Sequence, residues 1–242
     1  MSFRSSTEKR QYVRTMFGRI AHRYDLMNRV MTLGQDAGWR RAMVFAARLP
    51  PDGRFLDVAT GTGDVAFAAL RDESGPSLVV GVDFTLPMLE LARVRAGHST
   101  SARQKMPGLA AGDTLCLPFA SGTFDAVASA FLMRNVTDVE AALGEHMRVT
   151  RSGGQVLILD VPRPAGKTIR SRMFRLYFHR LVPLFGQVIT GQRDAYKYLP
   201  SSAETFLTPA ELAGIMESLG FQQVRYQLFM MGTVALHVGT RP

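Results

Sequence analysis

The chain of 242 residues contains a single cysteine, Cys116, and no long apolar run. One cysteine excludes an internal disulfide and any metal site built from several cysteines, and we expect Cys116 to be a small buried side chain. The five histidines are too scattered to suggest a metal site, so no metal is predicted. The apolar runs are too short to span a bilayer, and the first ten residues lack the hydrophobic region of a signal peptide. We therefore expect a cytoplasmic chain.

Internal repeats and low-complexity segments are absent as well, which excludes a repeat array. Hydrophobic residues make up 46% of the chain, enough for a sizeable core. Strand-like runs alternate with helical patterns, which predicts one α/β domain with helices on both faces of a mostly parallel sheet. We divide it into a helical N-terminal lid (1–50), a cofactor-binding core (52–161), a helical insertion (162–205) and a final helix with two strands (206–242).

The last two predicted strands lie within 220–226 and 233–238. The loop between them is too short for a crossover helix, so we expect them to pair antiparallel and to reverse the edge of the sheet. The helix before them has strong signals of its own. Thr208 is a good N-cap, Pro209 suits the first helical position, and apolar residues then recur at helical spacing.

A nucleoside-binding pattern follows the first predicted strand. Residues 55–64, FLDVATGTGD, predict a buried strand that enters a glycine turn and then a helix. Asp83 ends the next apolar run, about twenty residues on, where a carboxylate can bind both hydroxyls of a ribose. The residues that we expect to bind a cofactor here are Asp57, Thr60, Gly61, Gly63, Asp64, Asp83 and Phe84.

Two cofactors compete for this pattern. Residues 61–66 fit the G-x-G-x-x-G/A fingerprint of dinucleotide binding, which would make the protein a hydride transferase. However, Asp64 follows the second glycine, and an anion at that position repels the phosphates of a dinucleotide. S-adenosylmethionine has no phosphate and carries a cationic sulfur, so carboxylates at Asp57 and Asp64 favour it over NAD. The pattern therefore indicates a methyltransferase.

A third stretch, 110–119, predicts a short strand and a loop on the same side of the sheet. Asp113 stands where a carboxylate could accept a hydrogen bond from the exocyclic amine of adenine, with Gly112 and Thr114 beside it. The alternative is a plain turn, which would be preferred without the neighbouring strands.

The net charge of +9 is concentrated in residues 163–197, where Asp194 is the only acidic residue. On a helical wheel, apolar residues within 169–177 share one face and basic residues lie opposite, which predicts an amphipathic basic helix. Such a helix can lie on an anionic membrane, bind nucleic acid, or pack its apolar face on the domain. Packing is the commonest of these fates.

Several segments together resemble the quinone-biosynthesis C-methyltransferases of the UbiE type. The matching segments are 16–28, 57–66, 81–84, Arg134–Val136, Tyr198–Pro200 and 234–237. The resemblance implies a class I S-adenosylmethionine-dependent methyltransferase: a Rossmann-like, seven-stranded, mostly parallel sheet with an antiparallel last strand. It also implies methylation of demethylmenaquinol or a ubiquinone precursor beneath the N-terminal helices and the insertion.

Departures from the family pattern lie on the expected substrate side, at 132–133, 159–162 and 230–231. Because of these departures, a methyltransferase that acts on another hydrophobic aromatic metabolite is the alternative hypothesis. A non-enzymatic module that binds the cofactor or RNA is a third hypothesis, which the intact quinol-contacting residues disfavour. A prenylated substrate resides in the bilayer, so peripheral contact of the insertion with an anionic membrane becomes as plausible as packing, and no nucleic acid is expected. The oligomeric state stays open.

Carbon methylation sets requirements that name candidate catalytic residues. A ring carbon is a poor nucleophile until an adjacent hydroxyl loses its proton, so the quinol should react, and the enzyme must stabilise an oxyanion. Arg134 can hold that oxygen or orient a water, and Asn135 can add a hydrogen bond. Four residues could approach the ring as a base, although His237 could face a loop and Asp25 could be a local cap. They are Tyr24, Asp25, Asp160 and His237, of which we favour Tyr24 beside Arg134.

Overall fold

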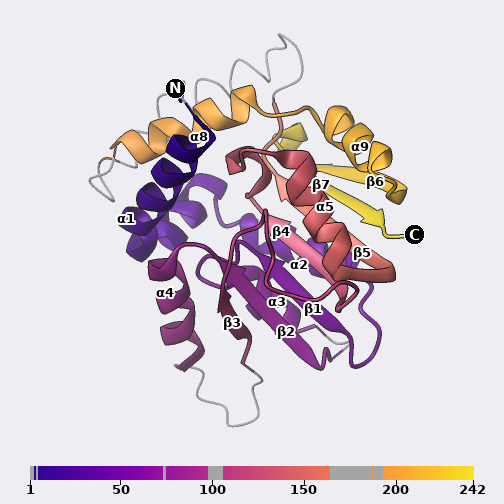
Figure 1. Ribbon diagram of the computed structural model, residues 1–242. Helices are drawn as coiled ribbons and strands as arrows, with labels where there is room; N and C mark the ends of the chain where they lie inside the picture. Colours follow the sequence, from indigo (N-terminus) through magenta and orange to yellow (C-terminus); the bar gives the residue numbers. More distant parts are fainter. Residues whose placement is uncertain (1–2, 4, 73–74, 98–105, 164–186, 188–192) are drawn as a thin grey trace.

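The computed structural model describes residues 3, 5–72, 75–97, 106–163, 187 and 193–242. A seven-stranded sheet in the order β3-β2-β1-β4-β5-β7-β6 forms its centre (Figure 1). The strands are β1 (Arg54–Val58), β2 (Leu78–Asp83), β3 (Gly108–Ala111), β4 (Phe124–Ala130), β5 (Thr150–Asp160), β6 (Gln222–Phe229) and β7 (Val234–Thr240). The first five pair in parallel, and β7 runs antiparallel to both of its neighbours. The predicted fold class is confirmed.

The reversed strand does not form the edge of the sheet, so that part of the prediction is wrong. β7 lies between β5 and β6, and β6 therefore runs parallel to β5 at the edge. Burial explains the order. Nearly every residue of β7 is buried, as a strand covered on both faces requires, whereas most residues of β6 are exposed.

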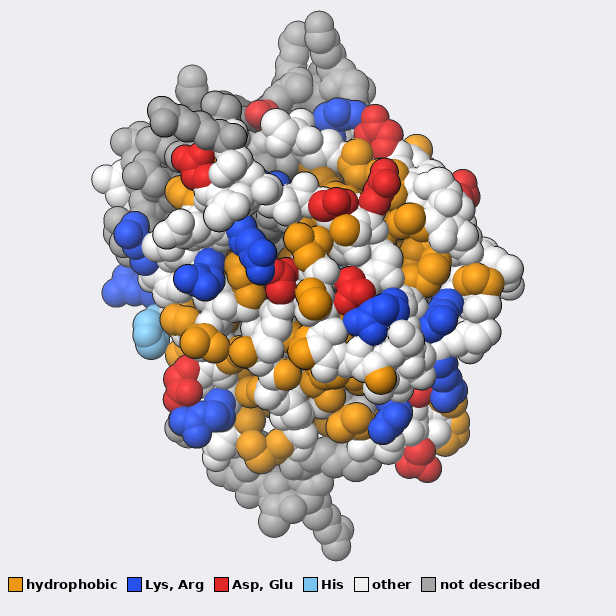
Figure 2. All heavy atoms as spheres, viewed as in Figure 1, with side chains coloured by type: hydrophobic (Ala, Val, Ile, Leu, Met, Phe, Trp, Pro, Cys, Tyr) orange, Lys and Arg blue, Asp and Glu red, His pale blue; other side chains and the backbone are white. Residues whose placement is uncertain are grey.

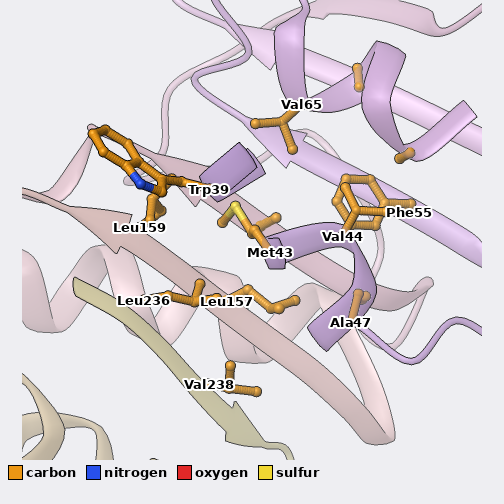
Figure 3. Close-up of a cluster of buried hydrophobic side chains, with 14 of the residues drawn as sticks. Trp39, Met43, Val44, Ala47, Phe55, Val65, Leu157, Leu159, Leu236 and Val238 are labelled. Atoms are coloured by element: carbon orange, nitrogen blue, oxygen red, sulfur yellow. The ribbon is translucent and has the colours of Figure 1, made fainter. Parts of the chain in front are cut away.

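Helices cover both faces of the sheet. They are α1 (Ser6–Thr32), α2 (Asp36–Ala46), α3 (Asp64–Leu70), α4 (Leu86–Gly97), α5 (Val139–Val149), α8 (Arg193–Thr205) and α9 (Pro209–Ser218). On one face, Trp39 and Met43 of α2 lie against Leu157 and Leu159 of β5 and against Leu236 of β7 (Figure 3). On the other face, α5 and α9 bury Leu143, Leu212 and Met216. The two cores hold the central strands in place, and with them the loops at their ends.

α1 and α8 lie side by side across the ends of the strands (Figure 1). Ser5 caps α1, since its hydroxyl accepts a hydrogen bond from the Glu8 amide at 3.1 Å. Buried residues of α1, including Val13 and Met16, pack with Tyr196 and Tyr198 of α8. The Tyr12 and Tyr198 ring centroids are 5.5 Å apart. The end of the insertion therefore holds the N-terminal lid, whereas the amphipathic helix predicted within 169–177 lies outside the described residues.

Three smaller predictions can be compared with the structure. The capping box at Thr208 and Glu211 is confirmed, and α9 begins at Pro209. Cys116 is exposed, so its predicted burial is wrong. It bridges to Asp113 in a turn that directs Leu117 inward instead. Among the described helices, none combines the length and the apolar character that crossing a membrane requires.

Candidate active site

Asp57 holds the glycine turn after β1 together. Its side chain is 1% exposed, and its carboxylate accepts hydrogen bonds from the Thr60 hydroxyl at 2.6 Å and the Ala66 amide at 3.0 Å. Gly63 has φ +90°, and a Cβ there would lie 2.8 Å from the Phe67 ring, so the turn requires glycine. These residues therefore fix the conformation of the glycine turn and the start of α3.

Burial raises the pKa of Asp57 from 3.8 to about 7, more than its hydrogen bonds lower it. The folded state then holds this proton more tightly than the unfolded state. Its contribution to the free energy of unfolding is therefore greatest at low pH and is lost as pH rises from about 4 to 7.

We expect Asp57→Asn to remove this pH dependence, because an amide does not titrate. The free energy of unfolding of the variant relative to wild type should rise by up to about 4 kcal/mol between about pH 4 and pH 7, and its relative Tm should rise with it. Melting curves of both proteins across that range measure it. Burial lowers the pKa of His146 to about 4, but that group is common to both proteins and cancels. Parallel pH profiles would contradict the expectation.

Asp83 lies at the end of β2 and faces a cavity, here called the nucleoside cavity. Its carboxylate accepts the Gly61 amide at 2.9 Å and the Thr85 amide at 2.7 Å. Burial raises its pKa, against the effect of these bonds. The Thr85 hydroxyl and the Phe84 amide also stabilise the ionised carboxylate, and Asp83 forms part of the cavity wall. Further residues that line this cavity are Phe84, Gly112, Asp113, Thr114, Leu132 and Asn135.

Two polar atoms at the nucleoside cavity are buried without a hydrogen-bond partner among the described residues: the Thr114 hydroxyl and the Asn135 carboxamide oxygen. The Asn135 amide nitrogen is held by the Phe131 carbonyl at 2.9 Å, which fixes the oxygen. Asp113 pairs with Arg10 of α1 above it. Because buried polar groups rarely lack partners, these atoms indicate a ligand.

Asp64 belongs to a different surface from Asp83. Its carboxylate pairs with Arg95 of α4 and, at 3.3 Å, with Arg40 of α2. These arginines lower its pKa although burial opposes them. Asp64 therefore ties three helices together in a groove on the outer side of the glycine turn.

We expect Asp64→Asn to affect stability more than cofactor affinity. Loss of its partly buried ion pairs, worth about 1 kcal/mol, should lower Tm by about 2–4 °C. Calorimetry with adenosylhomocysteine should give an affinity within about tenfold of wild type, since one outer charge contributes little through solvent. A hundredfold loss with unchanged Tm would instead assign Asp64 to direct contact with the cofactor.

A second space, here called the apolar pocket, adjoins the nucleoside cavity. Between them lies a space that Asp83 and Asn135 of the nucleoside cavity line together with Tyr24 and Phe131. Tyr24 and Phe131 also line the apolar pocket. Phe131 has φ +60°, a strained backbone conformation. The hydrogen bond that its backbone N–H donates to the Leu159 carbonyl at 2.7 Å holds it in place. The other lining residues are Asn28, Met31, Thr32, Asp36, Trp39, Arg134, Val161, Met230, Thr233 and Val234.

Arg134 and Asp160 form a buried pair at the apolar pocket. Their side chains are 7% and 3% exposed, and the Arg134 amide also donates to Asp160 Oδ2 at 3.2 Å. The guanidinium lies 5.5 Å from the centre of the Phe131 ring. Asp160 is thus committed to holding Arg134, which presents a fixed positive charge to the pocket.

The other predicted bases have different surroundings. Burial raises the pKa of Tyr24, so at neutral pH its hydroxyl is a donor. Asp25 accepts from the Thr62 hydroxyl at 2.6 Å and so joins the lid to the glycine turn. His237 Nε2 meets the Pro209 carbonyl at 2.9 Å under α9, and its ring contacts Tyr226. The structure brings together Tyr24, Arg134 and Asp160, but places Asp25 and His237 apart from them.

Sequence patterns missed several residues that build the two spaces. Asn28, Asp36 and Trp39 come from helices whose distance to β4 and β7 only the fold determines. Gly81, which lies within β2, is the one of these residues that the sequence could have indicated. A Cβ at this position would lie 2.7 Å from the Thr60 hydroxyl, so only glycine fits. A glycine inside a buried strand indicates such a close approach.

Comparison with known proteins extends over nearly the whole chain. The ubiE/COQ5 methyltransferase family matches residues 5–241. A demethylmenaquinone methyltransferase from Roseiflexus castenholzii is 46% identical over 234 residues, which cover 97% of this chain and 95% of the relative. One from Thermus thermophilus is 44% identical over 227 residues, which cover 94% and 100%. A ubiquinone/menaquinone biosynthesis C-methyltransferase UbiE from Desulfotalea psychrophila is 42% identical over 231 residues, which cover 95% and 90%.

Solved structures share the fold at low sequence identity. A SAM-dependent methyltransferase from Thermotoga maritima, described as a possible histamine N-methyltransferase, has a TM-score of 0.65 at 19% identity, covering 94% of this chain and 99% of its own. Phosphoethanolamine N-methyltransferase 2 from Haemonchus contortus, in complex with S-adenosyl-L-methionine, has a TM-score of 0.62 at 17% identity, covering 85% and 52%. This likeness concerns the fold alone.

Proposed function

Because this chain belongs to the ubiE/COQ5 methyltransferase family, we propose that it transfers a methyl group from S-adenosylmethionine to a ring carbon of demethylmenaquinol. One observation carries the proposal beyond family membership. The nucleoside cavity, with the buried carboxylate of Asp83, lies next to an apolar pocket with a buried arginine, and Tyr24 and Phe131 line the space between them as well as the pocket. A methyl donor and an aromatic ring would face each other there.

The polar groups of the nucleoside cavity, which are mostly hydrogen-bond acceptors, fit S-adenosylmethionine. Asp83 lines the cavity and would accept hydrogen bonds from the ribose hydroxyls. The oxygens of Thr114 and Asn135, which have no partner among the described residues, would meet adenine and the amino-acid end. Asp113 lines the same cavity and suits the adenine amine. Asp57, Thr60, Gly63 and Asp64 would act through the turn, without direct contact. The cofactor supplies a methyl group on a cationic sulfur.

The residues of the apolar pocket suit the chemistry of the quinol. Arg134 stabilises the oxyanion that forms when the ring hydroxyl gives its proton to water, which the guanidinium also orients. The ring carbon next to that oxygen would then form its bond to the methyl carbon while the bond to sulfur breaks with its electrons on sulfur. The ring proton passes to water, and the electron pair of its C–H bond restores the aromatic ring. Tyr24, protonated at neutral pH, donates a hydrogen bond beside the reacting atoms.

Transfer of a labelled methyl group from S-adenosylmethionine tests the function. We expect a short-chain demethylmenaquinol to be methylated under reducing conditions and its quinone to be inert, since the quinone has no hydroxyl to ionise. A benzoquinol precursor of ubiquinone is the competing substrate. Equal labelling of quinol and quinone would overturn the oxyanion step, and no labelling of either would overturn the proposed function.

A prenylated substrate resides in the bilayer, so the entrance of the apolar pocket would have to contact the membrane surface to receive it. Leu33 and Met231 are each 78% exposed, and they directly follow the lining residues Thr32 and Met230. Lys and Arg side chains lie over α1 on the face in Figure 2, and the insertion is basic in sequence. A surface that meets anionic lipid typically combines exposed apolar side chains with basic ones.

We expect the protein to co-sediment with liposomes that contain anionic lipid at low salt, and to be released as salt rises. Replacing both Leu33 and Met231 with serine should reduce the bound fraction about tenfold, because each removes apolar area from the interface. Methylation of a tail-less quinol by this variant is the control and should be unchanged. Absence of binding to anionic liposomes would exclude the membrane contact.

A further inference from the structure

Asn28 is a buried polar residue of the apolar pocket with hydrogen-bonding capacity to spare. Its side chain is 9% exposed, and its amide nitrogen makes no hydrogen bond of ordinary geometry to a described residue. It lies one helical turn after Tyr24 on the same face of α1. The Asn28 side chain lies beside the Tyr24 hydroxyl and acts to lower the pKa of that hydroxyl. An amide has two N–H donors, so that neighbour leaves at least one free.

The other polar side chains of the apolar pocket near Asn28 already have hydrogen-bond partners within the protein. The Thr32 hydroxyl lies 2.8 Å from the Asn28 backbone carbonyl and 3.0 Å from the Asp36 carboxylate, and its single hydrogen is donated to one of these two acceptors. Asp36 also accepts from Arg40, and Arg134 is held by Asp160. Asparagine is a poor helix former, and a buried donor without a partner destabilises the fold. Neither helix formation nor packing therefore explains this residue, whereas a ligand atom in the pocket does.

We infer that Asn28 is a positioning residue that donates a hydrogen bond to an oxygen of the substrate ring. The inference rests on the proposed function, whose substrate has two ring oxygens opposite each other. Arg134 comes from the short helix Met133–Asn135 and Asn28 comes from α1, so the two donors enter the pocket from different elements. Arg134 takes the oxygen next to the reacting carbon, and Asn28 takes the opposite one.

This assignment makes Asn28 the residue that selects rings with both oxygens. A donor that finds no oxygen opposite it stays unpaired in a closed pocket, so a ring without that oxygen is disfavoured. The chemistry at the reacting carbon would still proceed on such a ring, because the neighbouring hydroxyl is intact. Loss of Asn28 should therefore change selectivity as well as rate.

The test compares Asn28→Leu with wild type on two substrates with the same short prenyl chain. One is demethylmenaquinol, and the other is the naphthol that keeps the hydroxyl next to the reacting carbon and lacks the opposite one. We expect kcat/KM of the variant to fall about 10- to 100-fold on the quinol and to stay unchanged on the naphthol. The Tm should stay equal or rise, because an apolar side chain replaces a buried unpaired donor.

Met27→Leu is the matched control, since Met27 is fully buried on the same helix, in a cluster with Tyr196, and is not among the residues that line the apolar pocket. It should retain both wild-type rates. An equal loss on both substrates by Asn28→Leu, or no loss on either, would overturn the inference while wild-type turnover of the quinol upholds the proposed function. If wild type methylates neither compound, the proposed function fails and this inference fails with it.

Discussion

Replacing Arg134 with lysine should lower kcat on demethylmenaquinol by about 100- to 1,000-fold, the loss typical of removing one oxyanion donor. Lysine keeps the charge but loses the planar guanidinium that Asp160 and the Phe131 ring hold in one orientation. Adenosylhomocysteine affinity, measured by calorimetry, should stay unchanged because Arg134 lines only the apolar pocket among the cavities described. Steady-state kinetics under reducing conditions measure the loss of kcat.

Alanine is a poor choice at this position. It would leave Asp160 buried and unpaired, which costs about 3–5 kcal/mol and could unfold the chain. The double variant Arg134→Met with Asp160→Asn avoids an unpaired charge and is the matched control for stability. We expect it to fold and to be at least as inactive as the lysine variant. Wild-type turnover in either variant would remove the arginine from the mechanism.

Replacing Asp83 with alanine should weaken adenosylhomocysteine binding by at least about 100-fold. The carboxylate would bind two ribose hydroxyls, and hydrogen bonds to a charged group contribute about 1.5–3 kcal/mol each. The change also leaves the amides of Gly61 and Thr85 without their acceptor, so the loop that meets the cofactor loses its anchor. Calorimetry measures the affinity, and melting curves measure the cost to the fold.

Asp83→Asn separates the two effects. An amide oxygen can still accept from one backbone N–H, so we expect a higher Tm than in the alanine variant but a comparable loss of affinity. Comparison with Asp64→Asn is equally informative, because that carboxylate faces the arginines of the outer groove. Wild-type affinity in Asp83→Ala would contradict the assignment of the nucleoside cavity.

The three carboxylates near the glycine turn show where inference from sequence stops. Their spacing predicted a cationic, phosphate-free ligand, and the family confirms methyltransferase chemistry. Yet only Asp83 lines the cavity, while Asp57 turns inward and Asp64 pairs with Arg40 and Arg95. Asp57 and Asp64 therefore lie farther from a cofactor in this cavity than their position in the chain implied, and Asp83 alone of the three is placed to meet one.

Local patterns determined the elements of this protein. Buried strands appear as continuous apolar runs, the glycine turn needs residues that tolerate a left-handed backbone, and Thr208 with Glu211 caps its own helix. Each of these signals depends on residues within a few positions of one another. For that reason the strands, the glycine turn, the α9 start and the acidic end of β2 could be predicted from the sequence.

Tertiary structure alone decided how the apolar pocket is built. Its walls extend from Tyr24 on the first helix to Val234 on the last strand, and its charged pair joins residues 26 positions apart. Such contacts depend on the order of the strands and on where the lid helices settle, which hydrophobic packing of the whole domain determines. The sequence by itself therefore predicted a methyl donor and determined the class of fold. The placement of Asn28, Phe131 and the Arg134–Asp160 pair at one apolar pocket arose only when distant segments came together.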